Sequence, residues 1–123
     1  MVFKDFPLPN HAEAFKAAEA AHCAGEQGKY WELHDAMFAN QRALHVPTLK
    51  ETARKLGLDG ARFDACLDSG KHAPNVKADY ELGQRMGVNS TPTIYVNGRQ
   101  LMGAQPFEAF KQIIDEELAR AGK

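Results

Sequence analysis

Residues 90–99, which read Ser-Thr-Pro-Thr-Ile-Tyr-Val-Asn-Gly-Arg, constrain the fold more than any other stretch of the chain. Asn97-Gly98 lies between two runs that can form strands, and both residues tolerate the positive φ angles of a type I′ turn. The run before this pair is rich in β-branched and aromatic residues. The pattern therefore predicts a β-hairpin, with strands at about 93–96 and 100–104.

The proline of this stretch stands just before the first predicted strand. Pro92 has no N–H group to donate, and the first residues of a strand tolerate that loss. Only about 5% of X-Pro bonds in folded proteins are cis. Taken without further context, the residues therefore predict a trans Thr91–Pro92 bond.

Composition excludes several classes of protein. The 123 residues are the length of one domain, and 44% hydrophobic with 25% charged residues is ordinary for a globular fold. A net charge of −1 means that the chain has no excess of positive charge to attract nucleic acid or an anionic membrane. No apolar run approaches the roughly 20 residues of a membrane span, and the first five residues carry charge too early for an export signal. We therefore expect neither nucleic-acid nor membrane partners.

The remaining chain predicts one further strand and six helices. Residues 2–6 have apolar side chains at positions 3 and 6 with polar ones between them, and they predict a short strand ended by the prolines that follow. Five helices are expected between residues 10 and 87, and a sixth follows the hairpin with Pro106 at its first position. This last helix has one apolar stripe that should lie on the sheet, formed by Phe107, Phe110, Ile113, Ile114 and Leu118. Helix N-caps are expected at Asn10, Thr48 and Asp59. A small sheet with a large helical insertion belongs to the α/β or α+β class.

The residue patterns give no catalytic constellation. Cys23 and Cys66 are 43 positions apart without any Cys-x-x-Cys, so they are two free thiols, one disulfide or a redox pair. Cys23 is expected near a helix C-terminus, where the helix dipole disfavours a thiolate. The five histidines show no i, i+4 pair of the kind that binds zinc on a helix, so no metal site is predicted. His34 and Asp35 predict a packed, hydrogen-bonded pair, and no glycine-rich loop indicates a phosphate cofactor.

Several blocks, in this order along the chain, resemble DsbA-like thiol–disulfide oxidoreductases, which have a thioredoxin fold with a helical insertion. The resemblance covers essentially all 123 residues. The blocks that carry it are Val2 to Leu8, Ala20 to Ala24, Gln27 to Asp35, Leu56 to Asp59, Cys66 to Gly70, Gly87 to Thr93, Val96 to Gly98 and Gly103 to Pro106.

The resemblance implies a single domain over residues 1–123, with the helical insertion at about 10–87. Pro92 matches the family's cis-proline and Thr91 the variable residue before it, so both are implied to form a platform that pairs with a substrate polypeptide. Cys23 and Cys66 match secondary cysteines of part of the family, and we interpret them as a structural disulfide. Family members usually work outside the cytoplasm, whereas the compartment of this chain stays open.

One departure from the family changes the functional expectation. Family members carry another strand and a helix opening with Cys-x-x-Cys ahead of the segment that matches residues 2–6, and these 123 residues lack both. The resemblance thus implies an N-terminally truncated thioredoxin-like sheet, no catalytic residue as written and no exchange reaction. Open strand edges invite pairing, which predicts a homodimer. Two alternatives remain, namely a peptide-binding or self-assembling module that uses the Pro92 edge and a weak oxidoreductase that uses Cys23 and Cys66.

Overall fold

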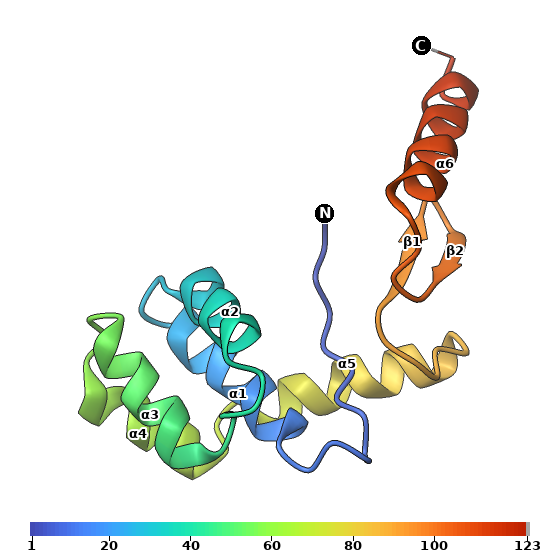
Figure 1. Ribbon diagram of the computed structural model, residues 1–123. Coiled ribbons are helices and arrows are strands. Elements are labelled where there is room, and N and C mark those ends of the chain that lie inside the picture. Colours follow the sequence, from blue (N-terminus) through green and yellow to red (C-terminus); the bar gives the residue numbers. More distant parts are fainter. Residues whose placement is uncertain (123) are drawn as a thin grey trace. The chain divides into compact units, whose positions relative to one another are not determined.

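The computed structural model describes residues 1–122, and it is a mixed α/β structure with six helices and one two-stranded sheet (Figure 1). The chain divides into two compact units, Met1–Leu82 and Gly83 onward, and the division falls within α5. Among the described residues, none of the helices has the length and apolar content needed to cross a bilayer. The helices are α1 Ala14–Gly25, α2 Tyr30–Ala39, α3 Val46–Lys55, α4 Gly60–Ser69, α5 Ala73–Arg85 and α6 Phe107–Arg120.

The first unit has a hydrophobic core between α1, α2, α3 and α4, which lie together in Figure 1. Helix α1 presents a face of small residues that includes Ala20 and Ala24, both fully buried. Alanine favours the helix and lets neighbouring helices approach closely. Larger side chains of the other helices fill the space against this face, and they are Leu33, Leu49, Phe63 and Leu67.

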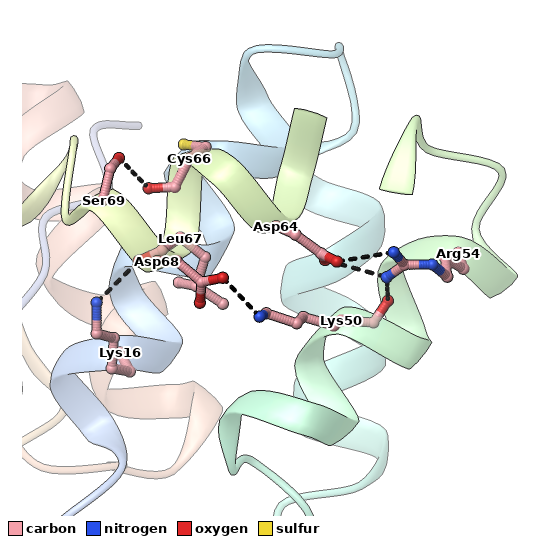
Figure 2. Close-up of polar contacts among 8 residues, drawn as sticks. All are labelled: Lys16, Lys50, Arg54, Asp64, Cys66, Leu67, Asp68 and Ser69. Carbon is pink, nitrogen blue, oxygen red and sulfur yellow. Dashed lines mark hydrogen bonds and ion pairs between the residues drawn. The ribbon is translucent and has the colours of Figure 1, made fainter. Parts of the chain in front are cut away.

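Polar side chains hold α4 between α1 and α3 (Figure 2). Lys16 Nζ of α1 donates a 2.9 Å hydrogen bond to the carbonyl oxygen of Leu67. On the other side, the Arg54 guanidinium of α3 donates two parallel hydrogen bonds, of 3.0 and 2.7 Å, to the Asp64 carboxylate. Such bidentate pairs fix direction as well as distance. Cys66, two residues after Asp64, therefore lies on a helix whose position is set from both sides.

One of the three expected N-caps is confirmed and two are wrong. Asp59 caps α4, since its Oδ1 accepts the Arg62 N–H at 3.1 Å. Residues 9–13 form turns instead, and α1 begins after Glu13 without a side-chain cap. Thr48 lies inside the first turn of α3, which begins at Val46. The physical reason is the adjacent proline, because its preset φ suits a first helical turn and moves the start ahead of Thr48.

The strand expected at residues 2–6 is absent from the described structure, which is a correction to the sequence analysis. The segment is held by side chains instead of a strand ladder. The Asp5 N–H donates to Asp79 Oδ2 of α5 at 3.1 Å, and the rings of Phe6 and Tyr80 stack with centroids 4.7 Å apart. A short run of this kind forms a strand only where another strand can pair with it, and here a side chain of α5 binds the backbone N–H of Asp5 instead.

The second unit contains the hairpin, with β1 Thr93–Val96 antiparallel to β2 Arg99–Met102. The Asn97-Gly98 turn is confirmed, and both residues have positive φ angles of 49° and 83°. The second strand ends at Met102, two residues earlier than expected. Gly103 has a φ of 81°, which takes the backbone out of the extended region and ends the strand.

Helix α6 was expected to place one apolar stripe on the sheet, and the structure bears this out only in part. The helix contacts β1, but Phe107, Ile114 and Leu118 of the stripe are exposed. Within the described part of this unit, residues 83–122, no apolar side chain is buried. Buried Glu117 accepts hydrogen bonds from Arg99 and Arg120 at 3.2 and 3.0 Å. This unit therefore leaves much apolar surface uncovered.

The contrast between two helix N-termini gives a prediction about stability. We expect Asp59→Ala to lower the free energy of unfolding by about 1 kcal/mol, because the Arg62 N–H loses its acceptor. Glu13→Ala is the matched control, since Glu13 occupies the same position of α1 without a capping hydrogen bond. Its cost should stay within a few tenths of a kcal/mol. Urea unfolding measures both, and equal losses would contradict this assignment of the caps.

Candidate functional site

Thr91 and Pro92 lie at the start of β1, and both are exposed. Their peptide bond is cis, which differs from the trans bond expected from the residues alone. The Pro92 carbonyl oxygen accepts the Gly103 N–H at 2.7 Å, so the entry to β1 is tied to the end of β2. On the other side, Thr93 Oγ1 donates to the Ser90 carbonyl oxygen at 2.7 Å.

The outer edge of β1 is open in the described structure, where the sheet contains only β1 and β2. Pairs of an antiparallel ladder alternate between those that exchange backbone hydrogen bonds and those that do not. Val96 and Arg99 close the two-residue turn and form a bonded pair, so Ile94 and Leu101 form the next one. The backbone groups of Thr93 and Tyr95 therefore point away from β2. They are free to pair with another extended chain.

Cys23 of α1 and Cys66 of α4 form a disulfide. Both residues are buried, with exposed fractions of 1% and 7%. Each lies near the C-terminal end of its helix, where the dipole disfavours negative charge. The pairing agrees with the structural disulfide that the family resemblance implies.

A group of polar side chains lies beside this disulfide. Glu26 Oε2 is 3.7 Å from Cys66 Sγ, and it accepts hydrogen bonds from Lys71 Nζ at 2.9 Å and His72 Nε2 at 2.5 Å. The hydrogen bond from Lys71, followed by that from His72, holds the pKa of Glu26 below its usual value. The imidazole of His72 also lies close to both sulfurs. Sequence spacing gives no sign of this group, because its members come from α1, α4 and the turn before α5.

A second polar cluster joins the N-terminal segment to α1 and α5. His22 Nε2 lies 2.6 Å from Asp5 Oδ2, and Asp79 accepts the Asp5 N–H. Burial raises the pKa of Asp5, although the hydrogen bond with His22 acts in the opposite direction. Burial also raises the pKa of Tyr30 to about 12, with the charges of Asp5 and Asp79 adding to the effect. Asp5 and Asp79 are 74 positions apart, so only the folded chain brings this cluster together.

The hydrogen bond expected between His34 and Asp35 is confirmed, with Nδ1 and Oδ1 3.0 Å apart. The imidazole lies among aromatic rings, which include those of Phe3, Trp31 and Phe38 at centroid distances of 4.8 to 5.2 Å. Asp35 is exposed. This arrangement is a packing contact between α2 and the N-terminal segment.

Comparison with known proteins decides the family. A family model described as thioredoxin matches residues 1–116. The chain belongs to the thioredoxin family. This agrees with the DsbA-like resemblance of the sequence and with the mixed α/β structure.

Curated relatives carry names of transport proteins. The chain is 36% identical over 121 residues to "Na(+)/H(+) antiporter NhaA 3" of Salinispora tropica, which covers 98% of this chain and 19% of the relative. It is 39% identical over 97 residues to "Na(+)/H(+) antiporter NhaA" of Herminiimonas arsenicoxydans, covering 79% of this chain and 16% of the relative. The chain therefore spans about a fifth of the length of these relatives.

The environment of Glu26 gives a prediction about pH. Its pKa is lower in the folded chain than in the unfolded one, so its contribution to stability is present at neutral pH. That contribution is lost as the pH falls below about 4.5, because the unfolded chain takes up the proton first. Glu26→Gln should therefore destabilise the protein at pH 7, and the difference from the wild type should shrink in acid.

Urea unfolding at a series of pH values from about 7 to about 3 measures this difference. Glu51→Gln is the control for removing a surface carboxylate, since the Glu51 side chain is exposed and pairs with Lys55 one turn along the same helix. A Glu26→Gln difference that stays constant over the whole range would contradict the assignment.

Proposed function

We propose that this domain binds extended polypeptide along the outer edge of β1, beside Thr91 and Pro92. The observation that carries this proposal is the open edge itself, where Thr93 and Tyr95 direct unpaired backbone groups away from β2. Strand addition of this kind obtains affinity from main-chain hydrogen bonds and specificity from alternate side chains. Family membership supports it, since the thioredoxin family is related to thiol–disulfide oxidoreductases that act on polypeptides.

Apolar side chains around the hairpin suit such a ligand. Ile94 and Met102 are 37% and 49% exposed, and Phe107 at the start of α6 is 73% exposed. An added strand places alternate side chains on the two faces of a sheet. Ile94 and Met102 lie on opposite faces of the hairpin, so each face offers an apolar contact to one set of ligand side chains.

We further propose that these residues bind without exchanging disulfides themselves. Attack on a disulfide needs access to a sulfur atom, and the rate depends on how readily a thiolate leaves. Here both cysteines are more than 90% buried, both lie near helix C-termini, and a carboxylate oxygen lies 3.7 Å from Cys66 Sγ. All three features disfavour a thiolate. They argue against the alternative of a weak oxidoreductase that uses Cys23 and Cys66.

A second copy of the chain is a competing occupant of the same edge, if the expected homodimer forms by strand pairing. The relatives named as antiporters suggest another arrangement, in which a domain of this type is one part of a longer protein. In either case we propose that the partner segment binds at the same outer edge of β1.

A matched pair of proline variants tests the proposed edge. Tyr95→Pro removes an outward N–H of β1, whereas Gln100→Pro removes the corresponding N–H from the outer edge of β2. Both changes remove the 3.2 Å hydrogen bond from Gln100 Nε2 to the Tyr95 hydroxyl, and Tyr95→Pro also removes the 3.4 Å bond from that hydroxyl to the Met86 carbonyl oxygen. An edge strand tolerates proline where its N–H faces away from the ladder.

On an array of short, cysteine-free peptides, we expect Tyr95→Pro to weaken binding at least about fivefold. Gln100→Pro should bind like the wild type. Light scattering without peptide is run alongside, to separate loss of binding from a change in self-association. Equal binding by all three proteins, or a loss confined to Gln100→Pro, would place the ligand elsewhere.

An insulin reduction assay tests the absence of exchange. With a dithiol as the reductant, the rate in the presence of the protein should equal the rate with the dithiol alone, since both sulfurs are buried and therefore react too slowly with thiols to take part in turnover. Cys66→Ser is the control, and it should give the same rate. An acceleration that the wild type provides and Cys66→Ser abolishes would restore the oxidoreductase alternative.

A further inference from the structure

Four side chains with metal-ligating atoms converge at one end of α1 and α4. The sulfur atoms of Cys23 and Cys66 and one imidazole nitrogen of His72 all lie within 4.8 Å of one another. Glu26 Oε2 lies 3.7 Å from Cys66 Sγ and 2.5 Å from His72 Nε2. The four residues come from α1, the residue after α1, α4 and the turn before α5.

One of these separations matches a tetrahedral zinc site, and the shorter ones are set by the disulfide bond and by the Glu26–His72 hydrogen bond. Zinc binds thiolate sulfur at about 2.3 Å and histidine nitrogen or carboxylate oxygen at about 2.0–2.2 Å, so its ligand atoms lie roughly 3.2–3.8 Å apart. The Glu26 to Cys66 distance already falls in this range. The Cα atoms of the two cysteines are 5.9 Å apart, which allows two thiolates to reach one ion. Reduction frees the two sulfurs to move apart, and rotation of the side chains would then bring the four ligand atoms to these distances.

We propose that the reduced protein binds one Zn²⁺ through Cys23, Cys66, His72 and Glu26, and that formation of the disulfide expels it. In the forward step, a dithiol reductant passes two electrons to the disulfide and leaves as its own disulfide. Two thiols result, and Zn²⁺ displaces their two protons. In the reverse step, a disulfide oxidant takes two electrons from the two sulfurs and leaves as a dithiol with two protons, and the ion departs.

The charges and hydrogen bonds around the four residues suit this ion. Two thiolates, one carboxylate and Zn²⁺ sum to a charge of −1, and Lys71 Nζ lies 2.9 Å from Glu26 Oε2 to offset it. The side-chain amide of Asn75 lies 2.9 Å from His72 Nδ1. The amide atom that faces Nδ1 is Nδ2. When Nε2 binds a metal, Nδ1 carries the proton, and a half-turn of the Asn75 amide would bring its oxygen into position to accept it.

The second polar cluster, formed by Asp5, His22 and Asp79, is the internal comparison. Its atoms also lie within 4.8 Å of one another, but it contains no sulfur and does not depend on the redox state. The rings of His22 and His72 stack with centroids 5.5 Å apart, so the two histidines share one neighbourhood. His22→Ala and His72→Ala are thus a matched pair that separates the two clusters.

The test measures Zn²⁺ affinity by competition with a chromophoric chelator, on protein kept reduced by a phosphine. We expect one Zn²⁺ per chain in the reduced protein and none after oxidation to the disulfide. His72→Ala should weaken binding at least about 100-fold, and His22→Ala less than about tenfold. With Co²⁺, the reduced protein should show thiolate-to-metal charge-transfer absorption and the intense visible bands of a tetrahedral site.

Circular dichroism of the two oxidised variants checks that both still fold. The same measurement on the reduced wild type, with and without Zn²⁺, shows whether the ion changes the helix content. A gain of helix on adding Zn²⁺ supports the site, because metal binding then contributes to folding. Three results would overturn the proposal: reduced wild type that does not compete with the chelator, oxidised protein that binds as well as reduced protein, or His72→Ala that binds like the wild type.

Discussion

The Cys23–Cys66 disulfide is the constraint on which the first unit depends. It joins α1 to α4 across 43 positions of sequence, a separation at which a cross-link removes unfolded-state entropy equivalent to about 4 kcal/mol. The core around it relies on small alanine side chains of α1, which bring the helices close but bury little area each. The covalent link and the Arg54–Asp64 pair on the far side of α4 therefore act together to fix this helix.

The second unit has the opposite character. Its hairpin and α6 leave several apolar side chains exposed and bury none of them fully, and its buried side chain among the described residues is that of Glu117, held by two arginines. Such a unit contributes little hydrophobic stabilisation of its own and presents an open strand edge. The same features make it suitable for binding another polypeptide. Stability and binding are thus assigned to different parts of the chain.

Local sequence patterns predicted the features that depend on a few neighbouring residues, namely the hairpin turn and one helix N-cap. Asn97-Gly98 specified the hairpin, because these two residues accept positive φ, and Asp59 specified a helix start through one hydrogen bond. The strand at residues 2–6 was a wrong prediction, since a strand also requires a partner that no local pattern reveals. The Cys23–Cys66 pairing came from resemblance to a family, and the residues alone left it open.

The two polar clusters could not be predicted because their members are brought together by tertiary packing, which no local pattern reveals. Glu26 meets Cys66 and His72 across 40 and 46 positions, and Asp5 meets Asp79 across 74. Each residue type was visible in the sequence, but a search limited to helical i, i+4 spacing cannot find ligands supplied by separate elements. The outward direction of Thr93 and Tyr95 was implicit in the turn, because a two-residue loop fixes the register of the whole hairpin.

Residue-resolved amide hydrogen exchange, measured with and without a bound peptide, tests the central claim about β1 most directly. Ile94 and Val96 donate within the hairpin, so their exchange should change little when a peptide binds. The N–H groups of Thr93 and Tyr95 point outward, and the proposed strand pairing requires that peptide binding slow their exchange. Protection that appears on Gln100 instead, or on no residue of the hairpin, would contradict polypeptide binding at this edge.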